Sequence, residues 1–222
     1  MILSIIVPVL NEAPGIVAAL QALALLREQE AELIVVDGGS SDNTRALCSG
    51  LADQLLTAPS GRARQMNLGA AHASGSTLLF LHADTRLPAA ATPAIKQALQ
   101  GHAWGRFDVS ISGRSALLPM VAQLMNWRSR LTGIATGDQA IFVTRKAFED
   151  AGGFPEQPLM EDVELSRRLL RHGRPACLRL RVLTSGRRWE QFGVWRTILL
   201  MWRLRFLYWL GTPAEHLARH YP

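Results

Sequence analysis

The chain has 222 residues, of which 48% are hydrophobic and 19% are charged, and it contains two cysteines. This length falls within the range of a single α/β domain and provides enough apolar residues for a sizeable core. The cysteines lack metal-ligand spacing, which favours a reduced cytoplasmic setting over a secreted, disulfide-stapled protein. The apolar start lacks the basic flank of a signal peptide, and no uncharged run is long enough to span a membrane.

Positive charge is concentrated in the second half of the chain. Residues 1–100 carry 6 basic and 8 acidic side chains, whereas residues 101–222 carry 18 and 10. All but two of the cations are arginines, whose planar guanidinium suits phosphate and carboxylate. Anionic substrates or lipid headgroups are therefore the expected partners, unless the arginines reflect compositional bias. No recognised nucleic-acid-binding motif is present, so we expect no nucleic-acid partner.

Strands and helices alternate through the first half of the chain. Strands are predicted over 4–9, 32–37, 53–57 and 77–81, and helices over 14–28, 42–49, 63–73 and 93–100. Further strands are predicted over 104–112 and 140–144, and further helices over 117–130, 161–171 and 192–210. This order predicts an α/β fold with a Rossmann-like, mostly parallel sheet flanked by helices. We expect the main domain to cover 1–180 and a C-terminal helical extension to cover 181–222.

The segment LIVVDGGSSDNT, residues 33–44, delivers an aspartate from a buried strand into a glycine-rich turn that opens a helix. Asp37 stands at the carboxyl end of the strand, where open α/β sheets bind ligands. Its carboxylate suits a ribose hydroxyl or a base N–H, and Gly39 lets the backbone approach a ligand closely. The alternative is a plain strand-to-helix turn with a capping aspartate.

Other carboxylates also follow predicted strands. Glu12 comes after the first strand and Asp84 after the strand over 77–81, while Glu161 and Asp162 begin a later helix. The carboxyl ends of parallel strands lie along one edge of a sheet, so we expect these groups to converge. The chain has neither a GxGxxG turn nor a GxxxxGK phosphate loop, which excludes dinucleotide oxidoreductase and P-loop interpretations.

The HADT sequence indicates a divalent cation. Asp84 supplies a carboxylate at a central strand, and a diphosphate with water would complete the coordination shell that Mg²⁺ or Mn²⁺ prefers. Such an ion would neutralise a departing nucleoside diphosphate. His82 is a candidate second ligand, with packing at the strand end as its alternative role.

Two helix starts carry further candidate residues. Arg62 and Arg64 open the helix over 63–73, where amide N–H groups and arginine favour an anion, although a solvated basic turn is the alternative. Gln65 and Asn67 within this alanine-rich helix indicate a ligand-facing side. In the helix over 161–171, Asp162 is the candidate general base.

Taken together, these segments resemble the family 2 glycosyltransferases, which are inverting, nucleotide-sugar-dependent enzymes of the GT-A fold. The resemblance covers roughly residues 1–175 through IIVPVLNE, VVDGGSSDNT, GRARQMNLGA, LLFLHADT, GDQAIFVTRKAFEDAGGFPE and MEDVELSRRL, in that order. The motifs HADT, GDQA and SGRRWEQFG are most similar to a short bacterial subgroup that includes arsenosugar-biosynthesis glycosyltransferases.

The resemblance implies roles for individual residues. Nucleotide binding is implied for Pro8, Asn11, Glu12, Asp37, Gly39, Arg62, Arg64 and Asp84. Asp84 would also hold the metal, and Asp162, with Glu161 beside it, would deprotonate the acceptor hydroxyl. Contact with the acceptor or the diphosphate is implied for Asp138, Arg187, Arg188 and Trp189. The family usually shows DxD where this chain has HAD, so His82 departs from the pattern.

The implied reaction is a single displacement with inversion, from a nucleotide-sugar donor to a hydroxyl acceptor that is either a small molecule or lipid-linked. Uridine diphosphate is the commonest donor nucleotide of the family. Two alternatives stay open, a sugar nucleotidyltransferase and a noncatalytic nucleotide-binding or membrane-recruitment module. The absence of a glycine-rich, lysine-bearing opening after the first strand argues against the former. The spacing of SGRRWEQFG differs from the QxxRW motif of processive relatives, so processivity is not predicted.

The C-terminal helix carries an apolar stripe with arginines beside it. The stripe contains Val194, Trp195, Ile198, Leu199, Trp202, Phe206 and Trp209. Packing on the main domain, contact with a membrane surface and a homodimer interface through 191–210 all fit this composition. We therefore expect a cytoplasmic protein, either free or peripheral at the inner face of the membrane.

Overall fold

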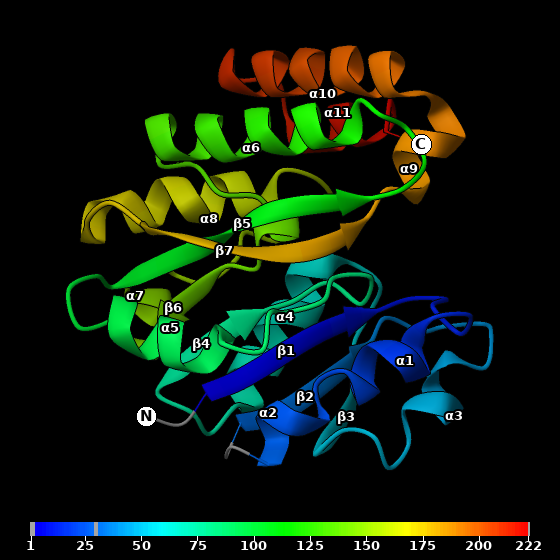
Figure 1. The fold of residues 1–222 in the computed structure, drawn as a ribbon, viewed down its shortest axis with the longest axis vertical. Coiled ribbons are helices and arrows are strands. Elements are labelled where there is room, and N and C mark those ends of the chain that lie inside the picture. The colour runs from blue at the N-terminus through cyan, green and yellow to red at the C-terminus, as the bar shows by residue number, and fades with distance from the viewer. Residues whose placement is uncertain (1–2, 29–30, 222) are drawn as a thin grey trace.

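The computed structural model describes residues 3–28 and 31–221, and Figure 1 shows that helices flank one twisted sheet. Its strands are β1 (Leu3–Val9), β2 (Ala31–Asp37), β3 (Gln54–Thr57), β4 (Thr77–Phe80), β5 (Trp104–Ser112), β6 (Phe142–Thr144) and β7 (Ala176–Ser185). Their order in the sheet is β3-β2-β1-β4-β6-β5-β7. Strand β6 runs antiparallel to both neighbours, and the other pairings are parallel. The predicted mostly parallel sheet is confirmed.

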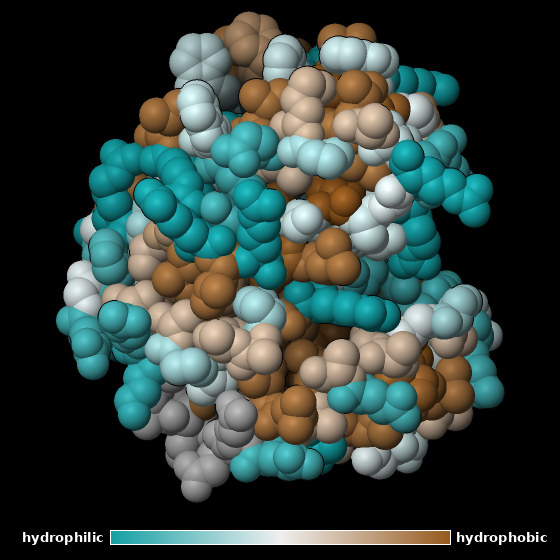
Figure 2. Space-filling view, in the orientation of Figure 1, coloured by the Kyte–Doolittle hydropathy of each residue, from teal (hydrophilic) through white to brown (hydrophobic). Residues whose placement is uncertain are grey.

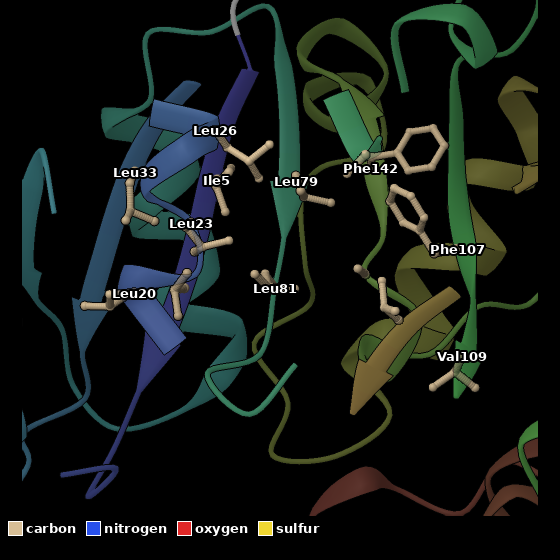
Figure 3. Close-up of a cluster of buried hydrophobic side chains, with 14 of the residues drawn as sticks. Ile5, Leu20, Leu23, Leu26, Leu33, Leu79, Leu81, Phe107, Val109 and Phe142 are labelled. Carbon is tan, nitrogen blue, oxygen red and sulfur yellow. The ribbon is translucent and has the colours of Figure 1, made fainter. Parts of the chain in front are cut away.

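Helices cover both faces of the sheet because the strands bury side chains on both sides. One face packs against α1 (Ile16–Gln21), α2 (Ala24–Glu28), α3 (Thr44–Cys48), α5 (Ala91–Ala98) and α6 (Leu118–Thr132). Figure 3 shows this core, in which Leu20, Leu23 and Leu26 face strand residues such as Ile5 and Leu33. The other face packs against α4 (Arg62–His72), α7 (Arg145–Asp150) and α8 (Glu161–Leu169).

The helix predicted over 14–28 is wrong as a single element, because the chain breaks it into α1 and α2. Leu20, Leu23 and Leu26 are all buried against the sheet. An α-helix has 3.6 residues per turn, so leucines spaced three residues apart would gradually rotate away from the sheet in a continuous helix. The turn at residues 22–23 interrupts the helix and keeps all three leucines against the sheet.

Strand β7 and the short helix α7 are absent from the sequence-based prediction. Strand β7 pairs in parallel with β5, and its register shifts so that Phe107 faces Leu178 while Asp108 faces Arg181. Residues 178–182, LRLRV, alternate apolar and basic side chains, so the sequence contains a strand pattern here that the prediction does not use. The strand also crosses the predicted boundary between the main domain, which was to end at residue 180, and the C-terminal extension.

The C-terminal segment forms α9 (Arg187–Phe192), α10 (Val194–Trp209) and α11 (Ala214–Ala218). Leu204 of α10 and Leu217 of α11 pack against Leu159 and Met160, which immediately precede α8. Most of the predicted apolar stripe, however, faces outward: Trp195, Leu199, Trp202, Phe206 and Trp209 are between 58% and 79% exposed. No helix within 3–28 or 31–221 combines the length and apolarity needed to cross a bilayer.

Helix α4 approaches the sheet unusually closely at Gly69. A Cβ atom at this position would lie 2.5 Å from Ile6 Cγ2 and 3.1 Å from Val36 Cγ2, both on buried strands. Glycine therefore sets the distance between α4 and the sheet, and with it the position of the loop at the helix N-terminus.

We predict that Gly69→Ala lowers the free energy of unfolding by about 1–2 kcal/mol, because overpacking against Ile6 outweighs the higher helix propensity of alanine. Urea denaturation would measure the change. Gly101→Ala is the matched control, because a Cβ there meets nothing within 4 Å. Equal or greater stability of the Gly69 variant would show that α4 moves away from β1 without cost.

Candidate active site

Two adjoining cavities lie along the edge of the sheet where the parallel strands end. The first has a volume of about 340 Å³ and the second about 240 Å³. Arg62, His82 and Asp84 line both. The chain passes from β1 to β2 and β3 on one side and then returns to β4 on the other, so the first cavity lies at a topological switch point of the sheet.

The first cavity brings together several of the predicted nucleotide-binding residues. Pro8 lies near the end of β1 and Glu12 follows that strand, while Arg62 begins α4 and Asp84 follows β4. The remaining lining residues are Val9, Leu10, Ser60, Gly61, Gln65, His82 and Ala83. The expected convergence of Glu12 and Asp84 at one edge is thus observed.

The turn after β2 uses its aspartate internally. The Asp37 carboxylate is 2% exposed and accepts hydrogen bonds from the backbone N–H groups of Gly39 and Ser40, at 3.2 Å. Asn11 ties this turn to the loop after β1, because its Oδ1 accepts the N–H of Ser41 at 2.8 Å. These contacts show that the loops beside the first cavity are shaped by Asp37, Gly39 and Asn11. A role of these residues in holding the nucleotide stays a prediction.

The polar residues of α4 are tied to the backbone of the protein. Gln65 Nε2 donates to the carbonyls of Val9 and Val36, both at 2.8 Å, and so joins the ends of β1 and β2. Asn67 donates to Phe154 O at 2.8 Å and accepts from its N–H at 2.9 Å. These amide groups help to hold the fold, and Gln65 also lines the first cavity, so a ligand-facing role of these two side chains stays a prediction.

The two arginines at the start of α4 diverge. Arg62 lines both cavities and lies 3.7 Å from the carboxylate of Glu161. Arg64 points to the surface, where it is 51% exposed and pairs with Glu156 at 3.3 Å. The geometry therefore supports Arg62 as an anion contact, and a role of Arg64 near the nucleotide stays a prediction.

The second cavity contains the two acids that begin α8. Asp162 Oδ2 accepts the N–H of Gly137 at 2.7 Å, which fixes the direction of its carboxylate. Glu161 is 5% exposed. Burial, together with the negative charge of Asp162, raises the pKa of Glu161, although Arg62 acts in the opposite direction. The surroundings therefore disfavour the charged form of Glu161 relative to a carboxyl group in water.

A histidine and an aspartate meet at the floor of the second cavity. His82 Nδ1 lies 3.5 Å from Asp138 Oδ1. Burial alone would raise the pKa of Asp138, but the hydrogen bond to His82 and the charges of His82, Arg62 and Arg205 together lower it. The other ring nitrogen, Nε2, packs against Gly137. A Cβ atom at residue 137 would lie only 2.3 Å from this nitrogen.

The loop that carries Asp84 is held by β7. Arg86 and Leu183 exchange backbone hydrogen bonds of 2.9 and 3.0 Å, and the hydroxyls of Thr85 and Thr184 are 3.1 Å apart. Just beyond β7, a Cβ at Gly186 would lie 2.0 Å from the carbonyl of Ser112, so only glycine allows this close turn. This turn directs α9 across the edge of the sheet.

Helix α9 places its arginines and tryptophan at the two cavities. Arg187 Nη2 lies 3.4 Å from Glu12 and 4.0 Å from Asp84, so it bridges the ends of β1 and β4. Arg188 and Trp189 line the second cavity together with Asp138. The Arg188 guanidinium also stacks on the ring of Tyr221 at 3.6 Å. Sequence analysis did not identify Tyr221, which only the fold of α10 and α11 brings here.

The residues present suit a divalent cation at Asp84 more than at His82. The Asp84 side chain is 32% exposed between the cavities. Both ring nitrogens of His82 face protein atoms instead. Within the described residues, no group of three or more His, Cys, Asp or Glu side chains is arranged to hold a metal. The donor set thus fits an ion shared between one carboxylate and a bound diphosphate.

Backbone strain is concentrated around the same cavities. Among residues 3–28 and 31–221, three non-glycine residues have positive φ: Asn11 at 55°, Ala140 at 47° and Met160 at 64°. They stand in the loop after β1, next to Gly137–Gln139 and immediately before Glu161. Strained conformations of this kind persist where the surroundings enforce them and often accompany functional sites.

Solved structures share this fold at low sequence identity. S. aureus TarS 1–349 in complex with UDP-GlcNAc aligns with a TM-score of 0.66 at 20% identity, over 84% of this chain and 59% of that chain. A mannosyltransferase of Pyrobaculum calidifontis in complex with GDP-Man and Mn²⁺ aligns with a TM-score of 0.65 at 23% identity, over 91% and 60%. Glucosyl-3-phosphoglycerate synthase of Mycobacterium tuberculosis in complex with Mn²⁺, UDP and glucosyl-3-phosphoglycerate gives 0.62 at 19% identity, over 86% and 74%. These likenesses confirm the predicted GT-A fold.

Sequence relatives agree with the fold. A PGL/p-HBAD biosynthesis glycosyltransferase of Mycobacterium bovis is 37% identical over 105 residues, which span 44% of this chain and 41% of that relative. The match therefore covers less than half of the relative. The family model described as glycosyl transferase family 2 matches residues 4–149. That match covers more than half of the chain and includes both strand-end acids of the first cavity, Glu12 and Asp84, so the chain belongs to the family 2 glycosyltransferases.

Proposed function

We propose that this protein transfers a sugar from a nucleoside-diphosphate sugar to a hydroxyl acceptor, with inversion at the anomeric carbon. The observation that carries the proposal is the junction of the two cavities at Arg62, His82 and Asp84. A nucleotide in the first cavity would direct its diphosphate toward Asp84. The attached sugar would then extend into the second cavity, where Asp162 stands.

Asp162 is the proposed general base. Its carboxylate is held by the Gly137 N–H at 2.7 Å, so it presents a fixed acceptor to the hydroxyl. As the acceptor oxygen attacks, its proton passes to Asp162 and a bond forms between that oxygen and the anomeric carbon. The bond between this carbon and the diphosphate oxygen breaks, and the nucleoside diphosphate leaves with the electron pair.

The leaving group gains negative charge that the protein has to stabilise. Arg62 and Arg187 flank Asp84 at the junction and provide donors for the diphosphate oxygens. Asp84 would hold a divalent ion, which when bound supplies a Lewis acid for the same oxygens. His82 would position Asp138 and the Gly137 turn.

UDP is the donor nucleotide that we test first. Solved structures of similar fold contain UDP-GlcNAc, GDP-Man and UDP, which supports a nucleotide donor without naming its base. The matched relative is named as a PGL/p-HBAD biosynthesis glycosyltransferase, which supports sugar transfer. The HADT, GDQA and SGRRWEQFG motifs all contribute residues to the second cavity, which supports a role for them at the reacting sugar. Their sequence likeness alone is the basis on which we propose the bacterial subgroup that includes arsenosugar-biosynthesis glycosyltransferases.

We predict manganese-dependent binding of UDP that weakens at least about tenfold in Asp84→Ala, because one carboxylate anchors the ion beside the diphosphate. Calorimetry with UDP, and with GDP as comparator, would measure it with and without Mn²⁺. Asp150→Ala is the matched control, because Asp150 pairs with Lys146 on the surface of α7. UDP binding that is unchanged in Asp84→Ala would refute the metal role, and no nucleotide binding at all would favour the noncatalytic alternative.

Asp162→Asn should reduce sugar transfer by about 10²–10⁴-fold, since general-base catalysis contributes about this much. The amide oxygen of asparagine still accepts the Gly137 N–H, so UDP affinity should change less than about twofold. The measurement is UDP release in a screen of donor sugars with hydroxyl acceptors. Full activity of this variant would move the base to another residue.

Glu161→Gln should stabilise the fold at neutral pH. The raised pKa means that ionisation of Glu161 costs folding free energy, and this cost appears as pH rises above the ordinary value of 4.5 and through the raised pKa. The variant should therefore exceed the wild type in unfolding temperature at pH 7, and the difference should shrink below pH 4.5. Glu149→Gln, at an exposed site, controls for the lost charge. A variant less stable at pH 7 would show that the pairing with Arg62 dominates.

A further inference from the structure

A third cavity of about 500 Å³ lies between α6 and α10. Its walls are largely apolar and include Leu124, Met125 and Trp127 of α6 and Ile198, Met201 and Trp202 of α10. Trp127 and Trp202 are 61% and 63% exposed, so the groove opens to the surface. Figure 2 shows apolar side chains among more polar ones over these helices, at the top of the view.

The apolar groove is continuous with the proposed catalytic cavity. Asp138, Arg188, Trp189, Met201, Arg205 and Tyr221 line both. A molecule seated in the groove would therefore reach the space that contains Asp162. The groove has the position of an acceptor channel, opposite the first cavity.

Two arginines stand in this groove with unused hydrogen-bond donors. Within the described residues, Nε and Nη2 of Arg128 and Nε of Arg205 are buried without a hydrogen-bond partner. Burial, followed by the charge of Arg205, lowers the pKa of Arg128 to about 9. Burial also lowers the pKa of Arg205. Leaving donors of this kind unpaired is costly, so the pair suits an anion that is supplied from outside.

The nearby carboxylates do not fill this role. Asp162 accepts the N–H groups of Gly137 and Val163, both at 2.7 Å, and Asp138 faces His82. Their charges act favourably on Arg205, but their oxygens are directed to other partners. The two guanidinium groups thus combine positive charge with free N–H groups beside an apolar wall.

We propose that the acceptor is an amphiphile with an acidic group, a phosphate or a carboxylate, held by Arg128 and Arg205, and with an apolar part in the groove between α6 and α10. This inference rests on the proposed transferase function, because it assigns the groove to the acceptor. The acidic group anchors the molecule where the groove meets the second cavity, and the reacting hydroxyl extends toward Asp162. The exposed tryptophans border the mouth through which the apolar part enters.

The test uses octyl phosphate as a soluble probe, with octanol and inorganic phosphate as its separate halves. Calorimetry on the full chain should show octyl phosphate binding at least about tenfold more tightly than either half. Arg128→Gln and Arg205→Gln should each weaken it about tenfold or more, because each removes a charge-assisted contact. Arg203→Gln, an exposed arginine of the same helix that does not line the groove, should leave the affinity within about twofold.

Equal affinity of wild type and both glutamine variants for octyl phosphate would overturn the proposal, as would octanol binding equally well. A third outcome would also overturn the proposal: the protein sediments with phosphatidylglycerol vesicles but does not bind octyl phosphate. This result would assign the face formed by α6 and α10 to a membrane surface. UDP binding with Mn²⁺, measured on the same samples, shows that the variants are folded. The same measurement separates the two proposals. Binding of UDP without binding of octyl phosphate would refute only the acceptor groove, and binding of octyl phosphate without binding of UDP would refute only the nucleotide site.

Discussion

The reversed strand β6 is the constraint on which the site depends. The parallel strands reach this edge of the sheet with their carboxyl ends, whereas β6 reaches it with its amino end. The turn before β6 therefore lies beside the residues that follow β4. Its Gly137 donates to Asp162 at 2.7 Å and leaves room for the ring of His82. Reversal of one strand thus joins three distant parts of the chain in one polar network.

The order of the strands places two separate cavities along this edge of the sheet. The switch point between β1 and β4 forms the first cavity, whose walls are backbone turns and strand ends. The second cavity is lined by residues that follow β4, precede β6 and begin α8, and β7 contributes Thr184 and Ser185 to its wall. Asp84 is shared because its loop leaves β4 between them. In the proposed reaction, a donor and an acceptor would therefore enter from different sides and meet in the second cavity, beside Asp162.

Sequence patterns predicted the features that depend on local periodicity. The strand ends at Glu12 and Asp84 were identified because apolar runs stop there, and parallel topology then places them together. The use of Asp37 by its own turn could not be distinguished from ligand binding, because both need the same residue in the same place. Strand β7 was not predicted although residues 178–182, LRLRV, alternate in sequence, and the irregularity opposite Phe107 arises in its pairing with β5, which a local sequence pattern does not show. The meeting of Arg128 and Arg205 depends on how α6 and α10 pack, which no local pattern records.

The contacts of Arg187 explain how the first cavity can be both polar and open. This side chain lies 3.4 Å from Glu12 and 4.0 Å from Asp84 and is 65% exposed. Ion pairs of such length at the surface contribute little, about 0–1 kcal/mol, so a diphosphate can replace them at low cost. The arginine would then follow the stronger anion while Asp84 turns to the metal. Glu12 and Asp84 keep the Arg187 guanidinium near the cavity. Because these ion pairs are weak, the arginine can move when an anion binds.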